Sequence, residues 1–293
     1  MKAPAFDYVR AQSLIQVFDL LALHGDNARV LAGGQTLLAT LNMRLSEPAL
    51  LIDITGLTEL RGISVTGQTL RIGALVTHTE IERSALVAQH APMLAQAAPH
   101  IAHRAIRNRG TWGGSLVYAD PAAEWPACVR ALGASLVLIS AQGQRRVSAD
   151  DFFLGLYSTA LHAGELLMAC EIPALAAGER QVFIELARRQ GDYAITGLAA
   201  RAHWRGGALH EPRLAFLGLE DRPVRALKTE QVVDGQVVTD SLLTRADQAL
   251  RSELQPGGDL TNSADTKHHL AAVLLQRALR QLAGASTQLE VKP

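Results

Sequence analysis

Two short segments pair adjacent glycines with hydroxyl side chains, at 31–37 (LAGGQTL) and at 107–115 (RNRGTWGGS). Glycine lets consecutive backbone N–H groups point the same way, which forms a concave nest for an anion and lets a phosphate approach the main chain. A helix expected after the first segment would add its N-terminal dipole, and Thr36, Thr111 and Ser115 can donate to phosphate oxygens. Either segment alone is typical of a tight turn, whereas two in one chain favour a shared diphosphate.

Other kinds of site are not indicated. The sequence has neither the G-x-G-x-x-G pattern of a Rossmann dinucleotide site nor the G-x-x-x-x-G-K-[ST] pattern of a P-loop. The two cysteines, Cys128 and Cys170, are too few for a four-thiolate iron–sulfur cluster, and their apolar neighbours indicate core positions. His100 and His103 lack an evident third ligand, so they are expected to face solvent and no metal site is predicted. No acid–base pair suited to hydroxylating a substrate stands out, and no catalytic residue is assigned.

The bulk composition narrows the classes of partner. Lys plus Arg and Asp plus Glu number 28 each, so no net charge favours nucleic acid or an anionic membrane. No apolar run approaches the ~20 residues of a membrane span, and the N-terminal MKAPAFDYVR lacks the apolar segment of a signal peptide. The cytoplasm is therefore the expected location.

The elements that must position the glycine segments can be read from hydrophobic spacing and from glycine and proline breaks. A small βαβ-like unit is expected first, in which Ser13 caps a helix that ends at Gly25. The stretch 79–102 predicts one long helical region, 110–120 an irregular one, and Pro121 opens a helix that ends near Gly133. A break at 173–178 precedes strands and then helices, which indicates an α+β C-terminal part. Further strands are expected at 29–32, 50–54, 62–65, 69–73, 135–139, 181–187, 198–204 and 214–219, and further helices at 36–44, 240–254 and 264–283.

Read with their neighbours, these residues resemble one family along nearly the whole chain. The longest matching stretch lies within 106–124 and contains IRNRGT, GGS and ADPAAE, with Ser115 where the family commonly has Asn. The family is that of the FAD-binding medium subunits of the xanthine dehydrogenase and carbon monoxide dehydrogenase group. Further matches are FDY (6–8), LAGGQTLL (31–38), LIDI (51–54), RIGA (71–74), DFF (151–153), ELL (165–167), IP (172–173), RRQGDYA (188–194) and KHHLAAVLL (267–275).

The resemblance implies an α+β fold. A two-subdomain FAD-binding domain of the PCMH type is expected over 1–175, with subdomains at about 1–57 and 58–175. A smaller α+β C-terminal domain with an antiparallel sheet is expected over 176–293. FAD would lie without a covalent link in the cleft between the two subdomains.

The resemblance also assigns the site. The two glycine segments would hold the FAD diphosphate, Glu124 stands where the family has an acidic residue that hydrogen-bonds the cofactor, and Asp120 is a second candidate nearby. Tyr193 would lie beside the flavin ring, where an aromatic face can stack. The expected FAD contacts are Ala32, Gly33, Gly34, Gln35, Thr36, Leu37, Ile101, Thr111, Gly113, Gly114, Ser115, Asp120, Glu124, Leu167 and Tyr193.

The implied role is electron transfer, with the organic substrate transformed on another chain. In the family a molybdenum cofactor (molybdopterin) on a large partner subunit hydroxylates the substrate. Electrons then pass through [2Fe–2S] clusters on a small partner subunit to FAD, and on to NAD⁺ or another acceptor. The expected assembly is a dimer of such heterotrimers. Two alternatives remain: a self-contained flavin oxidase of related fold, and a non-catalytic assembly module.

Several residues keep more than one interpretation. Asp120 and Glu124 can share one face of a helix near its N-terminus, where acidic side chains stabilise the helix without any cofactor. Trp112, where the family has a small aliphatic residue, either wedges the subdomains together or covers the cofactor. The arginines at 104, 107 and 109 form a solvated face, neutralise phosphates or meet a partner. Some members carry a lysine near the flavin where this chain has Ile184-Glu185, so the charge around the ring stays open.

Overall fold

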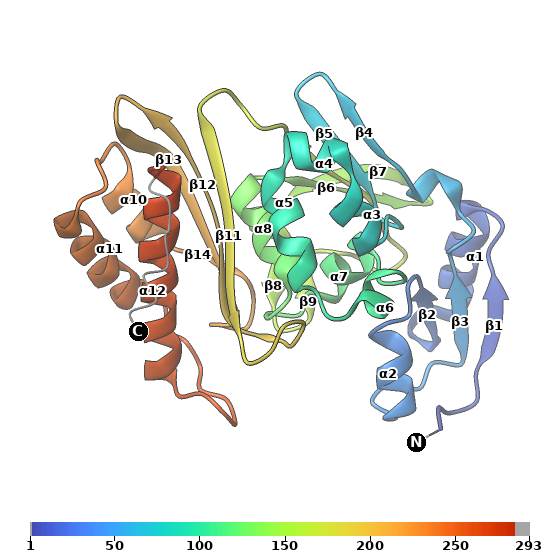
Figure 1. Ribbon diagram of the computed structural model, residues 1–293. Helices are drawn as coiled ribbons and strands as arrows, with labels where there is room; N and C mark the ends of the chain where they lie inside the picture. The colour runs from blue at the N-terminus through green and yellow to red at the C-terminus, as the bar shows by residue number, and fades with distance from the viewer. Residues whose placement is uncertain (1, 285–293) are drawn as a thin grey trace.

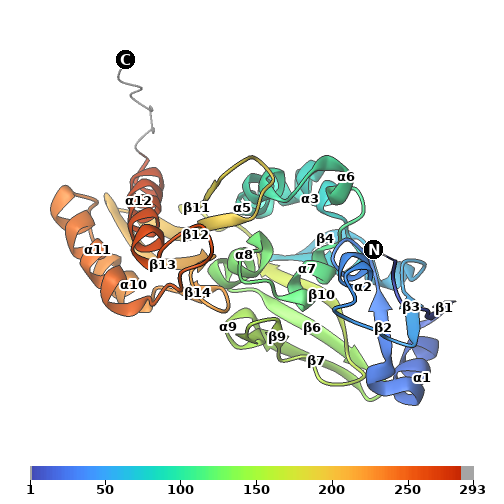
Figure 2. The same cartoon turned by 90° about the horizontal axis from the view of Figure 1, so that it is seen from below.

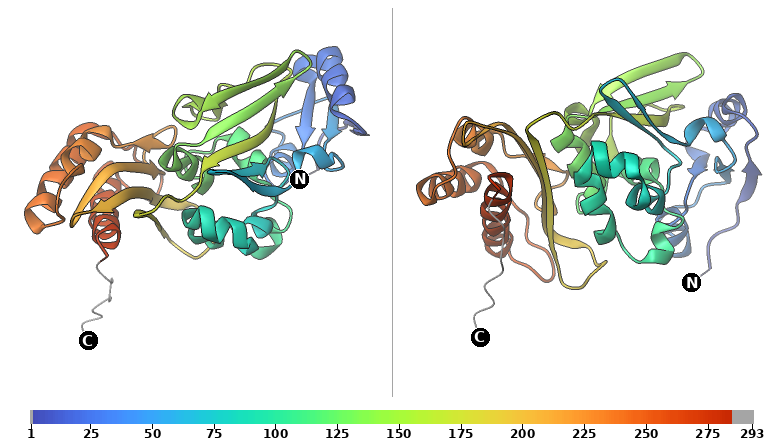
Figure 3. Two further views of the ribbon diagram at one scale, coloured as in Figure 1. Left: turned by 90° about the horizontal axis from the view of Figure 1, so that it is seen from above. Right: turned by 45° about the horizontal axis from the view of Figure 1, so that its top comes forward.

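The computed structural model describes residues 2–284 of the chain. Figures 1 and 2 show three blocks that follow one another in chain order: a small N-terminal sheet, a central sheet with most of the helices, and a C-terminal sheet with three helices. The central block lies between the other two in both views of Figure 3 as well.

The N-terminal block is a parallel sheet in the order β1-β3-β2. Its middle strand, β3, is buried along its whole length, as expected for a strand covered on both faces. Ser13 caps the first helix by accepting from Gln16 N at 3.2 Å and Gly25 ends it, as the sequence predicted. Strand β1 was not predicted, because its mostly exposed side chains give no apolar alternation. The block contains β1 (Asp7–Arg10), α1 (Leu14–His24), η1 (Gly25–Asn27), β2 (Ala28–Leu31), α2 (Leu37–Asn42) and β3 (Leu50–Asp53).

The central block is built on an antiparallel sheet in the order β4-β5-β10-β6-β7. The strands expected at 62–65 and 69–73 are confirmed, and they pair as the hairpin β4–β5. The middle strand, β10, was missed from the sequence although it pairs with both β5 and β6. Cys128 and Cys170 are buried and unpaired in this core, as predicted. The block contains η2 (Thr58–Leu60), β4 (Ile63–Thr66), β5 (Thr69–Gly73), α3 (His78–Arg83), α4 (Ala85–His90), α5 (Pro92–Ala97), η3 (Ala98–His100), α6 (Arg104–Arg107), α7 (Trp112–Tyr118), α8 (Glu124–Leu132), β6 (Ser135–Ser140), β7 (Gly143–Ser148), α9 (Ala149–Phe152), β8 (Phe153–Gly155), β9 (Ser158–Thr159) and β10 (Leu166–Pro173).

The expectation of one long helical region over 79–102 was wrong, because the segment is cut into the short helices α3, α4 and α5. Ser84 has an extended backbone, ends α3 and caps α4 by accepting from Val87 N. Ala91 leaves the helical region (φ −149°) before Pro92, since the proline ring disfavours a helical residue before it.

The glycine-rich stretch after Gly110 was also predicted wrongly as irregular, because it forms the helix α7. Thr111 is the N-cap of this helix, and Ala119 ends it with a left-handed backbone (φ 55°). Helix α8 begins at Glu124 rather than at Pro121, and Gly133 ends it as expected.

The C-terminal block is an antiparallel sheet in the order β11-β12-β13-β14. Helix α12 packs on β11 and β12 and α10 packs on β13, while α5 and α8 of the central block contact the same strands (Figure 1). The sheet is therefore covered by helices of two blocks. Helix α10 was not predicted from the sequence. The block contains β11 (Glu179–Ala187), β12 (Ala194–Arg205), β13 (Ala208–Leu217), β14 (Val224–Arg225), α10 (Leu227–Val233), α11 (Asp240–Glu253) and α12 (Ala264–Leu282).

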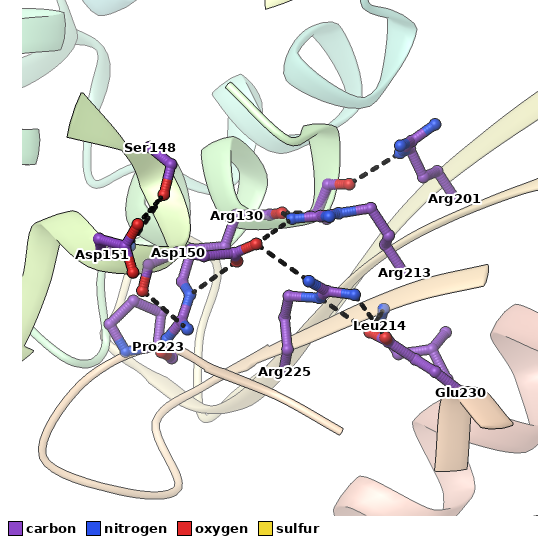
Figure 4. Close-up of polar contacts among 11 residues, drawn as sticks. Arg130, Ser148, Asp150, Asp151, Arg201, Arg213, Leu214, Pro223, Arg225 and Glu230 are labelled. Carbon is purple, nitrogen blue, oxygen red and sulfur yellow. Dashed lines mark hydrogen bonds and ion pairs between the residues drawn. The ribbon is translucent and has the colours of Figure 1, made fainter. Parts of the chain in front are cut away.

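A charged network joins the central and C-terminal blocks (Figure 4). Asp150 Oδ2 accepts from Arg213 Nη2 at 2.7 Å and from Arg225 Nη1 at 3.0 Å. Arg225 also binds Glu230, and Arg213 Nη2 donates to the carbonyl oxygen of Arg130 at 2.7 Å. Burial opposes ionisation of Asp150, but these arginines outweigh it and lower the pKa of the carboxyl group. The network therefore fixes the C-terminal sheet against α8 and α9.

Candidate functional site

The two glycine segments meet in the folded chain. A Cβ atom on Gly33 would stand 2.1 Å from the carbonyl oxygen of Arg109 and 2.9 Å from Gly110 Cα. No side chain can occupy that gap, so the close approach of the two loops requires glycine at Gly33. Gly34 follows with φ 72°, in the left-handed region that glycine adopts without strain.

A cavity of about 200 Å³ opens where the loops meet. The charged side chains that line it are both arginines, Arg61 and Arg109, and three hydroxyl groups stand nearby. This lining matches a doubly charged anion such as a diphosphate. The lining residues are Ala32, Gly33, Thr55, Arg61, Leu75, Thr77, Asn108, Arg109 and Thr111.

The first loop offers free hydrogen-bond donors. Within residues 2–284, the backbone N–H groups from Gly33 to Thr36 donate to no protein acceptor. Two carbonyl oxygens of the same loop already accept hydrogen bonds: Gly34 O accepts from Leu38 N, and Gly33 O accepts from the Gln35 side chain. Free N–H groups beside an arginine-lined cavity are the donor set that a bound phosphate satisfies.

The second loop differs from the sequence interpretation, because its N–H groups from Trp112 to Ser115 already donate to protein acceptors. Trp112 N donates to Val76 O and Gly113 N to Ala74 O, both in the segment that follows β5, each at 2.8 Å. Gly114 N donates to Thr111 Oγ1 at 3.1 Å, and Ser115 N to Thr111 O at 3.1 Å. The expected backbone nest is therefore not formed here, and this loop can offer the hydroxyl groups of Thr111 and Ser115.

Gly113 has a packing role. A Cβ atom there would stand 2.6 Å from Ala74 Cβ, so glycine lets the first turn of α7 rest on the strand end. Thr77 and Thr111 form a β-bridge beside it, and His78 N donates to Gly110 O at 3.0 Å. These contacts fix the position of the second loop.

Asp120 and Glu124 lie before and at the start of α8, so the expectation that they share a helix face was wrong. Asp120 Oδ1 accepts from Ala122 N at 2.9 Å within a turn. Glu124 is the first helical residue and is almost fully buried. Burial, and then the charge of Glu185, raise the pKa of Glu124 to about 8.

Sequence reasoning did not assign Glu185 to the site. Its side chain is only 2% exposed, and its Oε1 lies 4.0 Å from His100 Nδ1. Its Oε2 has no hydrogen-bond partner among the described residues. Burial raises the pKa of Glu185 to about 7. The sequence signal was a charged residue within the apolar strand VFIELA.

The remaining expected contacts fall into two groups. Ile101 and Leu167 are buried in the central core. Tyr193 is 72% exposed and lines a second cavity of about 750 Å³ between the central and C-terminal blocks. Asp120 and Tyr157 line the same cavity.

The alternatives left open at two positions are resolved by packing. Trp112 is fully buried with its ring 5.0 Å from that of Trp125, which identifies it as a core residue of the central block. Arg107 pairs with Glu82 at 3.1 Å and donates to Ile101 O, so it holds the chain before the second loop in place. His100 is half-buried against Phe183 rather than fully solvent-facing.

Two kinds of feature are absent from residues 2–284. No helix in this part of the chain is long and apolar enough to cross a membrane. No group of three or more His, Cys, Asp and Glu side chains within it is arranged to hold a metal ion.

Comparison with known families decides the identity of the fold. Residues 4–175 match the model described as the FAD binding domain in molybdopterin dehydrogenase. The chain belongs to the family of FAD-binding medium subunits of molybdenum hydroxylases. Residues 181–282 of this medium subunit match the CO dehydrogenase flavoprotein C-terminal domain. The expected α+β fold, with an antiparallel sheet in its C-terminal part, is therefore confirmed.

Three relatives show how closely the whole medium subunit follows this family. Caffeine dehydrogenase subunit beta of Pseudomonas sp. (strain CBB1) is 35% identical, over 100% of this chain and 99% of its own length. The carbon monoxide dehydrogenase structure from Hydrogenophaga pseudoflava has a chain with TM-score 0.94 and 36% identity, covering 97% of this chain and 99% of that one. Quinoline 2-oxidoreductase from Pseudomonas putida 86 gives TM-score 0.92 and 40% identity with the same coverage.

Proposed function

We propose that this medium subunit binds FAD without a covalent link and transfers electrons within a three-subunit molybdenum hydroxylase. Electrons would come from [2Fe–2S] clusters on a small partner subunit and leave for NAD⁺ or another acceptor. A large partner subunit would hold the molybdenum cofactor and transform the substrate. The proposed assembly is a dimer of such heterotrimers, and its proposed location is the cytoplasm.

The observation that carries the proposal is the meeting of the two glycine loops around the cavity lined by Arg61 and Arg109. The free N–H groups from Gly33 to Thr36 would hold the diphosphate from one side. The hydroxyl of Thr111 would hold it from the other side, while the arginines neutralise its charge. When bound, FAD supplies the redox chemistry that these side chains lack.

Other residues would orient the rest of the cofactor. Glu124 and Asp120 would form hydrogen bonds with polar atoms of the cofactor. The exposed ring of Tyr193 would stack on the flavin ring. The proposed FAD-binding domain covers 1–175, with subdomains at about 1–57 and 58–175, and the proposed C-terminal domain covers 176–293. Matches to 4–175 and 181–282 support this division.

The proposed clusters would need thiolates from a partner. The two cysteines of this chain are both buried and unpaired, and a four-thiolate cluster needs four. The relatives described as a subunit or medium chain support a divided enzyme.

The test is to purify the chain natively, release any flavin by denaturation and identify it. About one FAD per chain, released without covalent linkage, is the expected result. A chain that takes up no flavin even with added FAD and partner subunits would contradict the proposal and favour an assembly module. Reduction of its flavin by an organic substrate without partners would favour a self-contained oxidase.

A further inference from the structure

A buried histidine connects two helices and a glycine loop beside the arginine-lined cavity. His78 is the first residue of α3 and is only 5% exposed. Its Nδ1 accepts from the indole Nε1 of Trp125, in the first turn of α8, at 3.0 Å. Its backbone N–H donates to Gly110 O, in the second loop, at 3.0 Å. One residue of α3 is therefore bonded both to α8 and to the loop that precedes α7.

The imidazole ring also lies directly against the second loop. A Cβ atom on Gly110 would stand 2.7 Å from His78 Nε2 and 2.8 Å from His78 Cδ2. The neighbours of Gly110 on either side, Arg109 and Thr111, both line the cavity. Thr77, which precedes His78, lines it as well. A displacement of the ring would therefore move residues that form the wall of the cavity.

The bond to Trp125 determines the protonation state of the ring. An indole N–H can only donate, so Nδ1 of His78 must be unprotonated and Nε2 must carry the proton. Burial, and then the charge of Arg107, lower the pKa of His78 to about 4, so the ring is neutral at neutral pH. Arg107 of α6 is itself paired with Glu82 of α3 at 3.1 Å. A second proton on the ring would remove the acceptor for the buried indole.

The partner of His78 on α8 is next to a proposed cofactor contact. Glu124 begins α8 and directly precedes Trp125. The Trp125 ring also packs on that of Trp112, with centroids 5.0 Å apart, and Trp112 begins α7 just after the second loop. The hydrogen bond from Trp125 to His78 therefore fixes the first turn of α8 relative to the loop that lines the cavity.

We propose that His78 is a positioning residue of the cofactor site, and that its neutral ring, protonated on Nε2, holds the second loop and the first turn of α8 in place. The inference deepens the proposed function and rests on it. His78 acts through Arg109 and Thr111 on one side and through Glu124 on the other, rather than by contact with the cofactor.

The first test separates the hydrogen bond from the volume of the side chain. Asn and Leu have nearly the same shape, but only Asn can place an acceptor at the position of Nδ1. FAD affinity of the flavin-free chain should fall about tenfold or more in His78→Leu, because the buried indole loses its acceptor. It should stay within about threefold of the wild type in His78→Asn, since the acceptor is kept.

The matched control is Gln181→Met, which removes a buried acceptor outside the cavity lining. Gln181 Oε1 accepts from Met93 N of α5 at 3.2 Å. This substitution should lower the melting temperature and leave FAD affinity unchanged. Wild-type affinity in His78→Leu would overturn the positioning role, and so would an equal loss in His78→Asn or in the control.

The second test reads the ring itself and does not depend on whether His78→Leu folds. Nitrogen NMR of the labelled, flavin-free wild type should show a histidine with its proton on Nε2 whose signal is unchanged down to about pH 5 and is missing from His78→Asn. A His78 signal that titrates near pH 6.5, or a proton on Nδ1, would overturn the inference. Trp125→Phe keeps an aromatic ring but removes the donor, and should weaken FAD binding as His78→Leu does; wild-type affinity in this variant would also overturn it.

FAD uptake by the wild type is measured before any variant. A wild type that takes up no FAD refutes the proposed function, and this inference with it. Normal uptake that the His78 and Trp125 substitutions leave unchanged refutes this inference alone.

Discussion

Replacement of Gly33 by alanine tests the contact between the two loops. The new Cβ atom would stand 2.1 Å from Arg109 O, whereas real Cβ contacts essentially never fall under 3.0 Å. The loops must therefore separate by about 1 Å, and overpacking of this kind costs ~1–3 kcal/mol. Because 1.4 kcal/mol corresponds to a factor of ten, FAD affinity should fall roughly fivefold to 150-fold if the strain is expressed at the site.

The assay is titration of the flavin-free chain with FAD, followed by quenching of flavin fluorescence. Thermal unfolding of the same samples shows how much strain appears in the fold instead. The matched control is Gly56→Ala in the same block, where the nearest atom is Arg10 Nε at 3.4 Å, an ordinary contact. If Gly33→Ala binds FAD within twofold of both the control and the wild type, close contact of the loops is not what shapes the site.

Three further substitutions have defined outcomes. Thr111→Val removes the hydroxyl group that caps Gly114 N and should lower the free energy of unfolding, measured in urea, by ~1 kcal/mol. Thr111→Ser keeps a hydroxyl group and should restore the stability. Equal stability of the wild type and both variants would argue against the cap. Asp150→Asn leaves the arginines of Figure 4 without their shared carboxylate and should lower the free energy of unfolding by about 1–2 kcal/mol. The expected loss is smaller than for a fully buried ion pair, because Asp150 is partly exposed. An unchanged urea midpoint would contradict this. The folded-state pKa of Glu124 is raised from 4.5 to about 8, so its contribution to stability is fully present below pH 4.5 and is lost as pH rises towards 8. Glu124→Gln should flatten the fall in melting temperature over that range, and a variant that keeps the full wild-type slope would speak against a buried neutral carboxyl group.

The sequence by itself determined the features that depend on near neighbours. The cap at Ser13 and the stop at Gly25 are local, because a cap bonds to an N–H group two or three residues away. The hairpin β4–β5 is local for the same reason. The glycine pairs and the contiguous motif around 106–124 identified the family, since they need no knowledge of distant contacts.

The tertiary structure decided what depends on burial and on distant partners. The segment after Gly110 became a helix although it contains two glycines, because Thr111 caps it and its first N–H groups donate to Val76 O and Ala74 O, just after β5. The same bonds removed the second backbone nest that the glycines suggested. Strand β10 pairs with β5 and β6, which are distant in sequence, so its place in the middle of the central sheet could not be read from the sequence. The burial of Glu124 and of the Glu185 side chain could not be read from spacing, since it follows from packing of the C-terminal sheet on the central block.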